Sequence, residues 1–319
     1  MRDSTTYPSV IEAIGQTPLV ELSRITSEVE GTIVAKLEYL NPGFSKKDRI
    51  AKQIIQDAED SGKLRPGQAV VELTSGNTGT GLAIICGIKG YPFIAVMSRG
   101  NSAERARMMS ALGAEVILVD QVRGSQPGQV SGADLDQIEK RARKIVLKRN
   151  AFRADQFVLK GNFRAHYLHT GPEILSQAQV RIDAYCDFVG SGGTFAGCAA
   201  ALKEADPTIK CYVVEPQGAA VLAGQTADSP NHRIQGGGYA RADLPLLDTE
   251  MIEGYIQVTD DESRDTARRL AATEGIFAGF SSGANIAAAI RLLRIKEIHT
   301  VATTINDSGL KYLSTGLWP

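Results

Sequence analysis

Residues 69–88 read AVVELTSGNTGTGLAIICGI and join a predicted strand to a predicted helix through a glycine-rich turn. The first part, 69–73, is a short apolar run without strict polar alternation, which is typical of a strand buried on both faces of a sheet. The last part, 78–88, has the length and composition of a helix. Turns of this kind lie at the carboxyl ends of parallel strands, where open α/β folds bind ligands. The stretch therefore predicts one unit of a parallel α/β fold.

The same alternation extends through most of the chain. Further valine- and isoleucine-rich runs predict strands at 32–40, 93–97, 115–119, 184–190, 211–215, 255–259 and 300–305. Helical patterns between them predict helices at 47–61, 103–112, 134–148, 195–204, 261–274 and 283–293. Strands that alternate with helices in this way favour parallel sheets covered by helices on both faces.

Length and charge narrow the class of protein. The chain has 319 residues, which at about 150 residues per domain favours two domains or one large α/β unit. Lysine and arginine number 35 and aspartate and glutamate 36, so no basic surplus favours nucleic acid or an anionic membrane as a partner. The sequence has neither an apolar run of transmembrane length nor the apolar core of a signal peptide near its start. We therefore expect a globular, cytoplasmic protein.

The cysteines and histidines do not indicate a metal site. Cys86, Cys186, Cys198 and Cys211 form no CxxC pair, and most lie in apolar runs, so we expect buried free thiols. His166 and His169 would share a helix face, but no third ligand lies nearby in the sequence.

Two further glycine-rich turns open predicted helices. Residues 190–194 (GSGGT) resemble a phosphate cradle, in which backbone N–H groups and hydroxyls meet an anion at a helix start. Glu215 ends the next strand, where a dinucleotide-binding protein has its ribose-binding acid, but Phe195 replaces the last glycine of GxGxxG. The pattern is therefore compatible with two kinds of ligand, a nicotinamide cofactor or another phosphorylated cofactor. In the segment 279–284, Ser281 and Ser282 on their own are more simply helix caps.

A pair of lysines favours an aldehyde cofactor. Residues 41–49 read NPGFSKKDR, and they place Lys46 and Lys47 at a predicted helix start, where the helix dipole disfavours positive charge. A lysine there loses its proton more easily, which suits a Schiff base and later a general base. A solvated lysine is the alternative.

Together these segments resemble the cysteine synthase (O-acetylserine sulfhydrylase) family, a group of fold-type II pyridoxal phosphate enzymes that also includes cystathionine β-synthase. The resemblance runs nearly end to end, over segments at 14–20, 41–49, 74–79, 190–194, 279–283 and 307–315. TSGNTG at 74–79 matches the family's carboxylate loop letter for letter. At the position of Lys46 the family usually has an apolar residue. Because of this difference, a non-catalytic binding homologue remains an alternative.

The resemblance implies an α/β fold with two open, twisted, mainly parallel sheets flanked by helices, similar to the tryptophan synthase β subunit. It implies a smaller mobile domain over 41–155, with the substrate carboxylate loop. A larger domain would combine 1–40 with 156–319 and carry the phosphate cradle. Proteins of this family are usually homodimers.

The resemblance also implies a role for each site residue. Lys47 would hold pyridoxal 5'-phosphate as a Schiff base and act as the catalytic base, and Ser281 would face the ring nitrogen. Asn77 would hydrogen-bond the ring hydroxyl. The cofactor phosphate would be bound by Gly190, Ser191, Gly192, Gly193 and Thr194. The substrate carboxylate would be bound by Thr74, Ser75, Asn77, Thr78 and Gln156.

The implied reaction is β-replacement on an activated L-serine, O-acetylserine or O-phosphoserine, through an aminoacrylate, with sulfide giving L-cysteine. Residues 159–162 (LKGN) and 236–243 (GGGYARAD) depart from the family, so an amine or another thiol remains open as the nucleophile. Arg233 and Arg241 could meet a phosphate leaving group, although solvated loop arginines are the simpler interpretation. A nicotinamide-dependent oxidoreductase is the alternative of another class, and it leaves Lys47 and the 74–79 loop unexplained.

Overall fold

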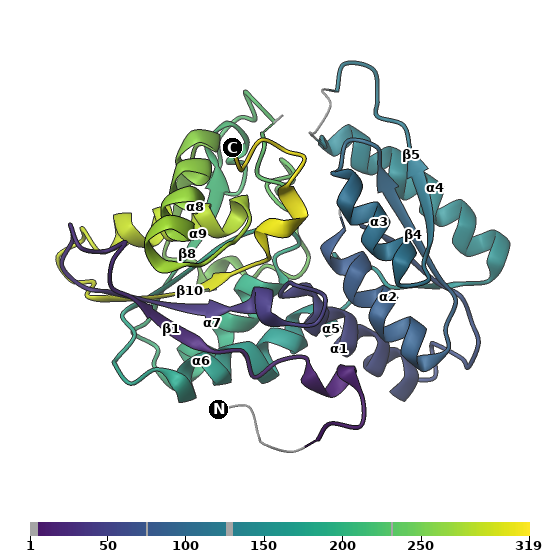
Figure 1. The fold of residues 1–319 in the computed structure, drawn as a ribbon, viewed down its shortest axis with the longest axis horizontal. Coiled ribbons are helices and arrows are strands. Elements are labelled where there is room, and N and C mark those ends of the chain that lie inside the picture. Colours follow the sequence, from purple (N-terminus) through teal and green to yellow (C-terminus); the bar gives the residue numbers. More distant parts are fainter. Residues whose placement is uncertain (1–5, 75, 126–129, 231) are drawn as a thin grey trace.

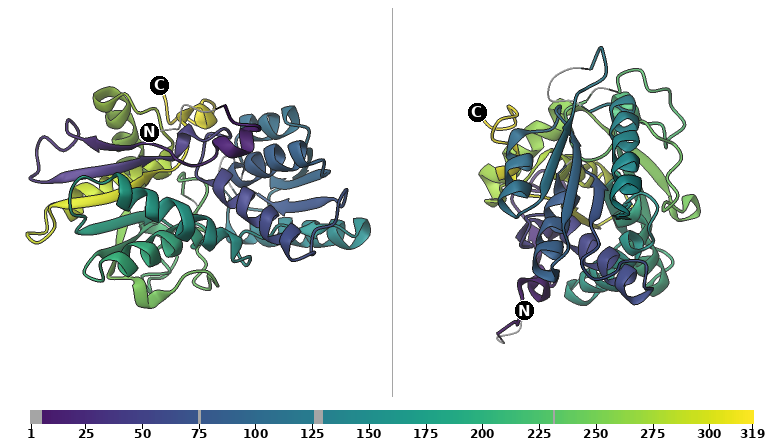
Figure 2. Two further views of the ribbon diagram at one scale, coloured as in Figure 1. Left: turned by 90° about the horizontal axis from the view of Figure 1, so that it is seen from below. Right: turned by 90° about the vertical axis from the view of Figure 1, so that its right-hand side faces the viewer.

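The computed structural model describes residues 6–74, 76–125, 130–230 and 232–319 (Figure 1). It contains two sheets, each flanked by helices. Near the region where the two halves meet lie the helices α1 (Lys47–Asp60), α2 (Asn77–Lys89), α5 (Gly161–Ala165) and α7 (Gly193–Ala205) (Figures 1 and 2). The expected α/β fold with two mainly parallel sheets is confirmed.

The larger sheet has six strands, all parallel except the first. Its order is β1-β2-β10-β7-β8-β9, and only the β1–β2 pair is antiparallel. Ala302 of β10 pairs with Val34 of β2 on one side and Tyr185 of β7 on the other, so the last strand lies inside the sheet. The strands are β1 Leu19–Leu22, β2 Thr32–Leu37, β7 Ala184–Phe188, β8 Lys210–Pro216, β9 Gly254–Val258 and β10 Thr300–Ile305.

The smaller sheet has four parallel strands in the order β5-β4-β3-β6. These are β3 Val70–Leu73, β4 Phe93–Ser98, β5 Glu115–Val119 and β6 Phe152–Arg153. All four lie within residues 41–155, and the strands of the larger sheet all lie outside that range. We therefore propose 41–155 as the smaller domain and 1–40 with 156–319 as the larger one.

Helices cover both faces of each sheet because successive strand residues point to opposite sides. In β3, Val70 packs into a core with α1 and α2, whereas Val71 packs into a second core with α4. The larger sheet separates a core with α8 and α9 from a core with α6 and α7 in the same way. The helices are α1 Lys47–Asp60, α2 Asn77–Lys89, α3 Ala103–Ala111, α4 Gly132–Arg149, α5 Gly161–Ala165, α6 Gly171–Gln177, α7 Gly193–Ala205, α8 Asp260–Glu274 and α9 Phe280–Leu292.

Several boundaries differ from the sequence prediction. The strand predicted at 32–40 ends at Leu37 and continues as a 3-10 turn, Glu38–Leu40. Strands β1 and β6 were not predicted, since four and two residues are too short for a hydrophobic pattern to be recognised. Helices α5 and α6 were also missed, together with the π-helical segment His166–Thr170 between them.

All four cysteines are buried free thiols, as predicted. Burial raises the pKa of each thiol to about 12.

Within the described ranges, none of the helices combines the length and the apolar character that a membrane span requires.

Candidate active site

One cavity brings together most of the residues singled out from the sequence. It lies where α1, α2, α7 and α9 begin, next to the end of β7. Its walls carry two lysines, a glycine-rich loop and several hydroxyl and amide groups. They comprise Lys46, Lys47, Asn77, Asp187, Phe188, Val189, Gly190, Ser191, Gly192, Thr194, Phe195, Gln235, Gly236, Ser281 and Asn306.

Lys47 is the first residue of α1, and it lines this cavity. Its backbone N–H donates to the Ser45 hydroxyl at 3.2 Å, which fixes the start of the helix. Burial, and next the charge of Lys46, lower the pKa of Lys47 to about 7, against the opposing effect of Asp187 and Asp307. The sequence argument expected a lowered pKa from the helix start, and the structure shows that burial is the largest cause. A large fraction of this amine is therefore neutral near pH 7 and able to attack a carbonyl carbon.

Lys46 is buried and paired with one carboxylate. Its Nζ lies 2.8 Å and 2.7 Å from Oδ1 and Oδ2 of Asp187, at the end of β7. Asp187 thus binds the neighbouring lysine, and of the two amines Lys47 is the one suited to a cofactor aldehyde.

The loop between β3 and α2 is held by its own hydroxyl groups. Thr74 Oγ1 accepts hydrogen bonds from the N–H groups of Gly76 (3.0 Å) and Gly79 (2.9 Å). Gly76 has a φ of 123°, in the region that favours glycine, and it forms the turn directly before α2. Ser75, predicted as a carboxylate ligand, lies outside the described residues.

Gln156, three residues after the end of β6, supports this loop. Its Oε1 accepts from Thr78 Oγ1 at 2.6 Å, and its Nε2 donates to Glu72 Oε1 (3.1 Å) and to the Leu73 carbonyl (3.2 Å). The structure brings Gln156 to the loop, as predicted, with its amide hydrogens directed at β3. A direct contact of Gln156 with a substrate carboxylate stays a prediction.

Asn77 is oriented by the C-terminal part of the chain. Its Oδ1 accepts from Lys311 Nζ at 2.8 Å, and its Nδ2 donates to Asp307 Oδ2 at 2.7 Å. Lys311 Nζ also donates to the carbonyl of Gly43 at 2.7 Å, next to the lysine segment. Among the described residues Asn77 Nδ2 has this one acceptor, so its second hydrogen can serve a ligand in the cavity. Residues 307–315 stand out in the sequence as a motif, but nothing in the sequence connects them to Asn77.

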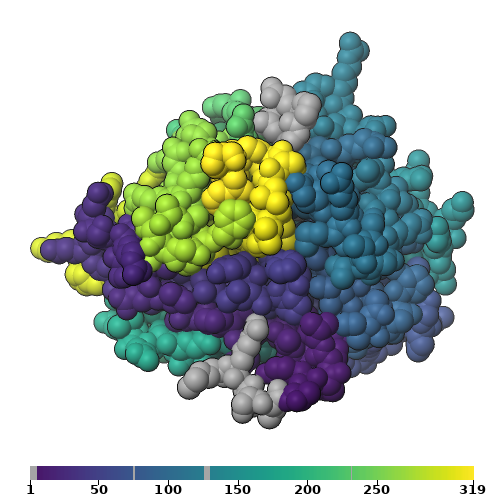
Figure 3. Space-filling model, viewed as in Figure 1, coloured from purple at the N-terminus to yellow at the C-terminus, as the bar shows by residue number. Residues whose placement is uncertain are grey.

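The same C-terminal segment contacts α3 of the smaller sheet. Ser102 Oγ donates to the carbonyl of Lys311 at 3.1 Å, and Ser314 Oγ donates to Glu104 at 2.7 Å. Figure 3 shows the C-terminal atoms packed against those of α3 and its neighbours on this face. The two halves of the chain are therefore joined beside the cavity.

The glycine-rich loop after β7 forms the start of α7. Gly192 has a φ of 85°, and the helix begins at Gly193, two residues earlier than predicted, without a side-chain cap. A Cβ on Gly190 would lie 2.5 Å from the carbonyl oxygen of Gly236, and one on Gly193 would lie 2.3 Å from Asn162. The first-turn N–H groups of a helix have no intrahelical partner, and with the Ser191 and Thr194 hydroxyls they fit a phosphate group.

His166 positions Thr194 in this cradle. Its ring nitrogens lie 3.1 Å from Thr194 Oγ1 and 2.9 Å from Thr170 Oγ1. Burial, followed by the charges of Lys47 and Lys46, holds the pKa of His166 well below its ordinary value, so the ring is neutral. His169 is exposed, and the described residues contain no group of three or more potential metal ligands. The sequence analysis considered His166 only as a metal ligand.

Ser281 lies inside the first turn of α9 and is not its cap. The helix begins at Phe280, three residues earlier than predicted, so the interpretation of Ser281 and Ser282 as helix caps is wrong. Ser281 Oγ accepts from Asn306 Nδ2 at 3.0 Å, and Ser282 Oγ accepts from the Asn306 N–H at 2.9 Å. Ser281 is therefore held at the wall of the cavity.

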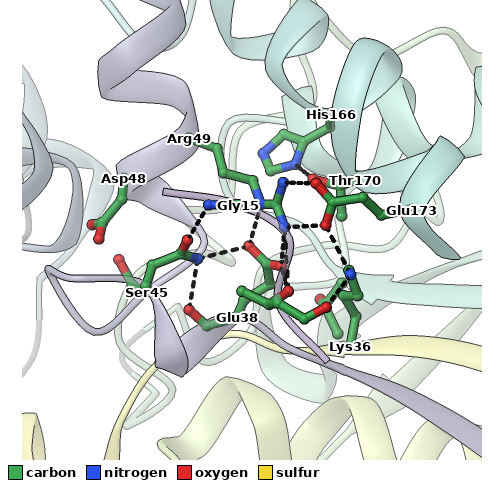
Figure 4. Close-up of polar contacts among 12 residues, drawn as sticks. Gly15, Lys36, Glu38, Ser45, Asp48, Arg49, His166, Thr170 and Glu173 are labelled. Atoms are coloured by element: carbon green, nitrogen blue, oxygen red, sulfur yellow. Dashed lines mark hydrogen bonds and ion pairs between the residues drawn. The ribbon is translucent and has the colours of Figure 1, made fainter. Parts of the chain in front are cut away.

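Arg49 anchors α1 through a buried cluster of charged side chains (Figure 4). Its guanidinium donates to both oxygens of Glu38 at 2.7 Å and to those of Glu173 at 2.7 and 2.8 Å. Lys36 Nζ lies 2.8 Å from Glu173 Oε2. Burial opposes ionisation of Glu173, but the hydrogen bonds and charge of Arg49 hold its pKa at about 2. Arg49 thus ties the lysine-bearing helix to the 3-10 turn that follows β2 and to α6.

The remaining candidate residues lie outside the cavity lining. Arg241 forms an ion pair with Asp136, and the Arg233 side chain is exposed, as expected of loop arginines. The Glu215 carboxylate accepts the N–H groups of Leu222 and Ala223, both at 3.0 Å. Glu215 therefore has a structural role that requires no nucleotide.

Comparisons with known proteins agree with this geometry. Residues 10–307 match the family described as "Pyridoxal-phosphate dependent enzyme". The chain is 39% identical over 315 residues to the cysteine synthase of Staphylococcus aureus, covering 97% of this chain and 96% of the relative. The solved structure of an O-ureido-L-serine synthase is similar with a TM-score of 0.87 and 36% identity, over 98% of this chain and 95% of that one. An O-acetylserine dependent cystathionine β-synthase from Helicobacter pylori has a TM-score of 0.89 and 31% identity, over 99% and 100%.

The residues of the cavity also fit the cofactor of these proteins. An amine with a pKa of about 7 suits an aldehyde, and the glycine cradle at the start of α7 suits a phosphate. The chain therefore belongs to the pyridoxal-phosphate dependent enzymes, in the group that comprises the cysteine synthases and cystathionine β-synthases.

Proposed function

We propose that this chain, a pyridoxal phosphate-dependent β-substituted-alanine synthase, replaces the leaving group of O-acetyl-L-serine or O-phospho-L-serine by sulfide and forms L-cysteine. The observation that carries the proposal is the single cavity that joins Lys47, Asn77, the 190–194 cradle and Ser281. The bound cofactor would supply an electron sink for breaking bonds at Cα and Cβ of the amino acid.

Each residue then has a defined task. Lys47 would hold the aldehyde group of the cofactor, and its amine, when free, would take the Cα proton of the amino acid. The N–H groups and hydroxyls of 190–194 would hold the phosphate at the start of α7, and the Asn77 amide, which donates to Asp307, would also donate to the ring hydroxyl. The carboxylate of the amino acid binds at the loop of Thr74, Ser75 and Thr78, next to Gln156.

A second nucleophile class is favoured by two observations. One similar structure is that of an O-ureido-L-serine synthase, whose name indicates a product other than cysteine. Gln235 and Gly236 line the cavity at the edge of 236–243, a segment that departs from the family. We therefore keep β-replacement by an amine or another thiol as the alternative.

We further propose that the enzyme works as a homodimer in the cytoplasm, with a small amino acid and a small nucleophile as its only substrates. The balanced charge of the sequence, −1 at neutral pH, supports the absence of a nucleic acid partner.

The test is a visible absorption spectrum of the purified protein with pyridoxal phosphate, titrated in turn with O-acetylserine, O-phosphoserine and serine. A visible band that moves to longer wavelength with one of the activated serines supports the proposal and identifies the donor. A band unmoved by all three contradicts the donor assignment. Product analysis with sulfide, homocysteine and a small amine then separates cysteine formation from the alternatives.

A further inference from the structure

Two lysines face the candidate active site, although a cofactor with a single aldehyde group needs only one of them. Lys46 and Lys47 are neighbours at the start of α1, and both line the cavity. Their Cα atoms are about 3.8 Å apart, which is less than the length of a lysine side chain. An aldehyde group that Lys47 reaches is therefore within range of Lys46 as well, unless Lys46 is held elsewhere.

The Lys46 amine is held at the end of β7. Its Nζ lies 2.8 Å and 2.7 Å from the two carboxylate oxygens of Asp187, and the Lys46 backbone N–H donates to the carbonyl of Asn306 at 2.9 Å. Both side chains of the ion pair are buried, with exposed fractions of 6% and 1%. Such a pair keeps both partners charged, because neutralising one of them would leave the other charge buried without compensation.

The charge of an amine decides whether it can react with an aldehyde. A neutral amine attacks the carbonyl carbon with its lone pair, a C=N double bond forms, and the carbonyl oxygen leaves as water with the two amine hydrogens. An ammonium has no lone pair and must first lose a proton, which the pairing with Asp187 opposes in Lys46. Among the described residues Lys47 has no carboxylate at ion-pair distance, and burial is the main cause that lowers its pKa to about 7.

We propose that Asp187 is a positioning residue that selects between the two lysines: it holds Lys46 as an ammonium at the end of β7 and so leaves Lys47 to bind the cofactor aldehyde. This inference rests on the proposed function in that Lys47 is the residue that holds the cofactor. The pairing explains how the chain carries a second lysine in this cavity without losing the chemistry of the first.

The variant Asp187→Asn removes the negative charge and keeps the shape of the side chain. The amide oxygen can take over the contacts of Asp187 Oδ1 with Asn285 Nδ2 (3.0 Å) and Thr304 Oγ1 (2.8 Å). The amide nitrogen then replaces Oδ2 beside the Lys46 amine, and an NH₂ group accepts no hydrogen bond from an ammonium. A buried amine without a counter-charge gives up its proton, so Lys46 becomes a second nucleophile in the cavity.

The experiment reduces the enzyme loaded with pyridoxal phosphate by borohydride and locates the label by peptide mass spectrometry. Reduction turns the C=N bond into a stable C–N bond, so the label marks the amine that held the aldehyde. We expect the wild type to carry the label on Lys47, and in Asp187→Asn we expect the share on Lys46 to rise at least about tenfold. Asp183→Asn is the matched control, because Asp183 precedes β7 at its opposite end and accepts the backbone N–H of Thr300. This control should keep the label on Lys47.

A second variant tests the same inference without changing Asp187, and it serves if Asp187→Asn does not fold. In Lys47→Ala the ion pair is intact, so Lys46 should carry no label after reduction, although it is the other lysine in the cavity wall. In Lys47→Ala/Asp187→Asn the label should appear on Lys46.

Label on Lys46 in the wild type or in Lys47→Ala would overturn the proposal, because the ion pair would then not restrain this amine. A folded Asp187→Asn that keeps the label confined to Lys47 would also overturn it. A packing defect lowers the total label of a variant but does not move it from one lysine to the other. A wild type that takes up no label on either lysine would instead count against the proposed function.

Discussion

Replacing Arg49 by methionine tests whether the buried cluster of Lys36, Glu38, Arg49 and Glu173 holds α1 in place. The cluster contains two positive and two negative side chains, and the change leaves Glu38 and Glu173 with Lys36 as the remaining cation. Removing one partner of a buried pair costs about 3–5 kcal/mol, because an uncompensated charge stays buried. We therefore expect the free energy of unfolding of Arg49→Met, from urea unfolding followed by circular dichroism, to fall by about this amount at pH 7.5.

The loss in the free energy of unfolding of Arg49→Met, relative to the wild type, should become smaller as the pH falls. In the wild type the pKa of Glu38 and that of Glu173 are below the ordinary value of 4.5, so their stabilisation is present above that pH and declines as the pH falls. In Arg49→Met the pKa of one carboxyl group rises, and the folded protein binds a proton as the pH falls from 7.5 toward 4.5. The variant thus gains stability over this range relative to the wild type. Arg143→Met, which breaks the exposed pair with Glu139, is the matched control and should leave the urea midpoint unchanged. A loss in Arg49→Met no larger than in this control would refute the reasoning.

Three further outcomes are expected. Because the pKa of Lys47 is about 7, the rate of covalent cofactor loading, followed by the visible band, should rise with pH through about 7 and level off above it; a flat profile from pH 6 to 8 would contradict the assignment. Gly193→Ala should weaken binding of pyridoxal phosphate at least tenfold (about 1.4 kcal/mol), since its Cβ would lie 2.3 Å from Asn162. The control is Gly87→Ala, whose Cβ would have its nearest contact 3.6 Å away and which should leave the dissociation constant unchanged. The four cysteines, buried and with pKa values raised to about 12, should react with a thiol reagent only after unfolding; rapid labelling of the native protein would show that the burial is wrong.

The parts of the site that are local in sequence could be predicted from it. The strand–turn–helix units around Asn77 and Gly193 follow from glycine conformation and apolar runs, and both turns line or border the cavity as expected. The contacts between distant segments could not be predicted, because they depend on how the two sheets meet. The bonds of Asn77 to Asp307 and Lys311 span more than 200 residues, and sequence patterns carry no distance information of that kind.

Lys46 illustrates the same limit. In the sequence it is an odd charge beside the candidate Schiff-base lysine, and it raised the question of a non-catalytic homologue. The structure supplies its partner Asp187, 141 positions away, and the oddity becomes one half of a buried pair. The charge of Lys46, at a position that is usually apolar, is thus compensated within the fold by Asp187, and it is no evidence against the lysine motif.

The position of β10 has a consequence for how the chain reaches its folded state during synthesis. This strand, Thr300–Ile305, is the last strand of the sheet to be made but lies between β2 and β7, so the six-stranded sheet stays divided until residues 300–305 have left the ribosome. The four strands of the other sheet are complete by Arg153 and can pair much earlier. Chains released early, before Thr300, would carry one sheet able to form and one with its middle missing, and exposed strand edges of that kind favour aggregation. Residues 300–305 therefore decide whether the larger sheet of a nascent chain can close or keeps exposed strand edges that quality control can recognise.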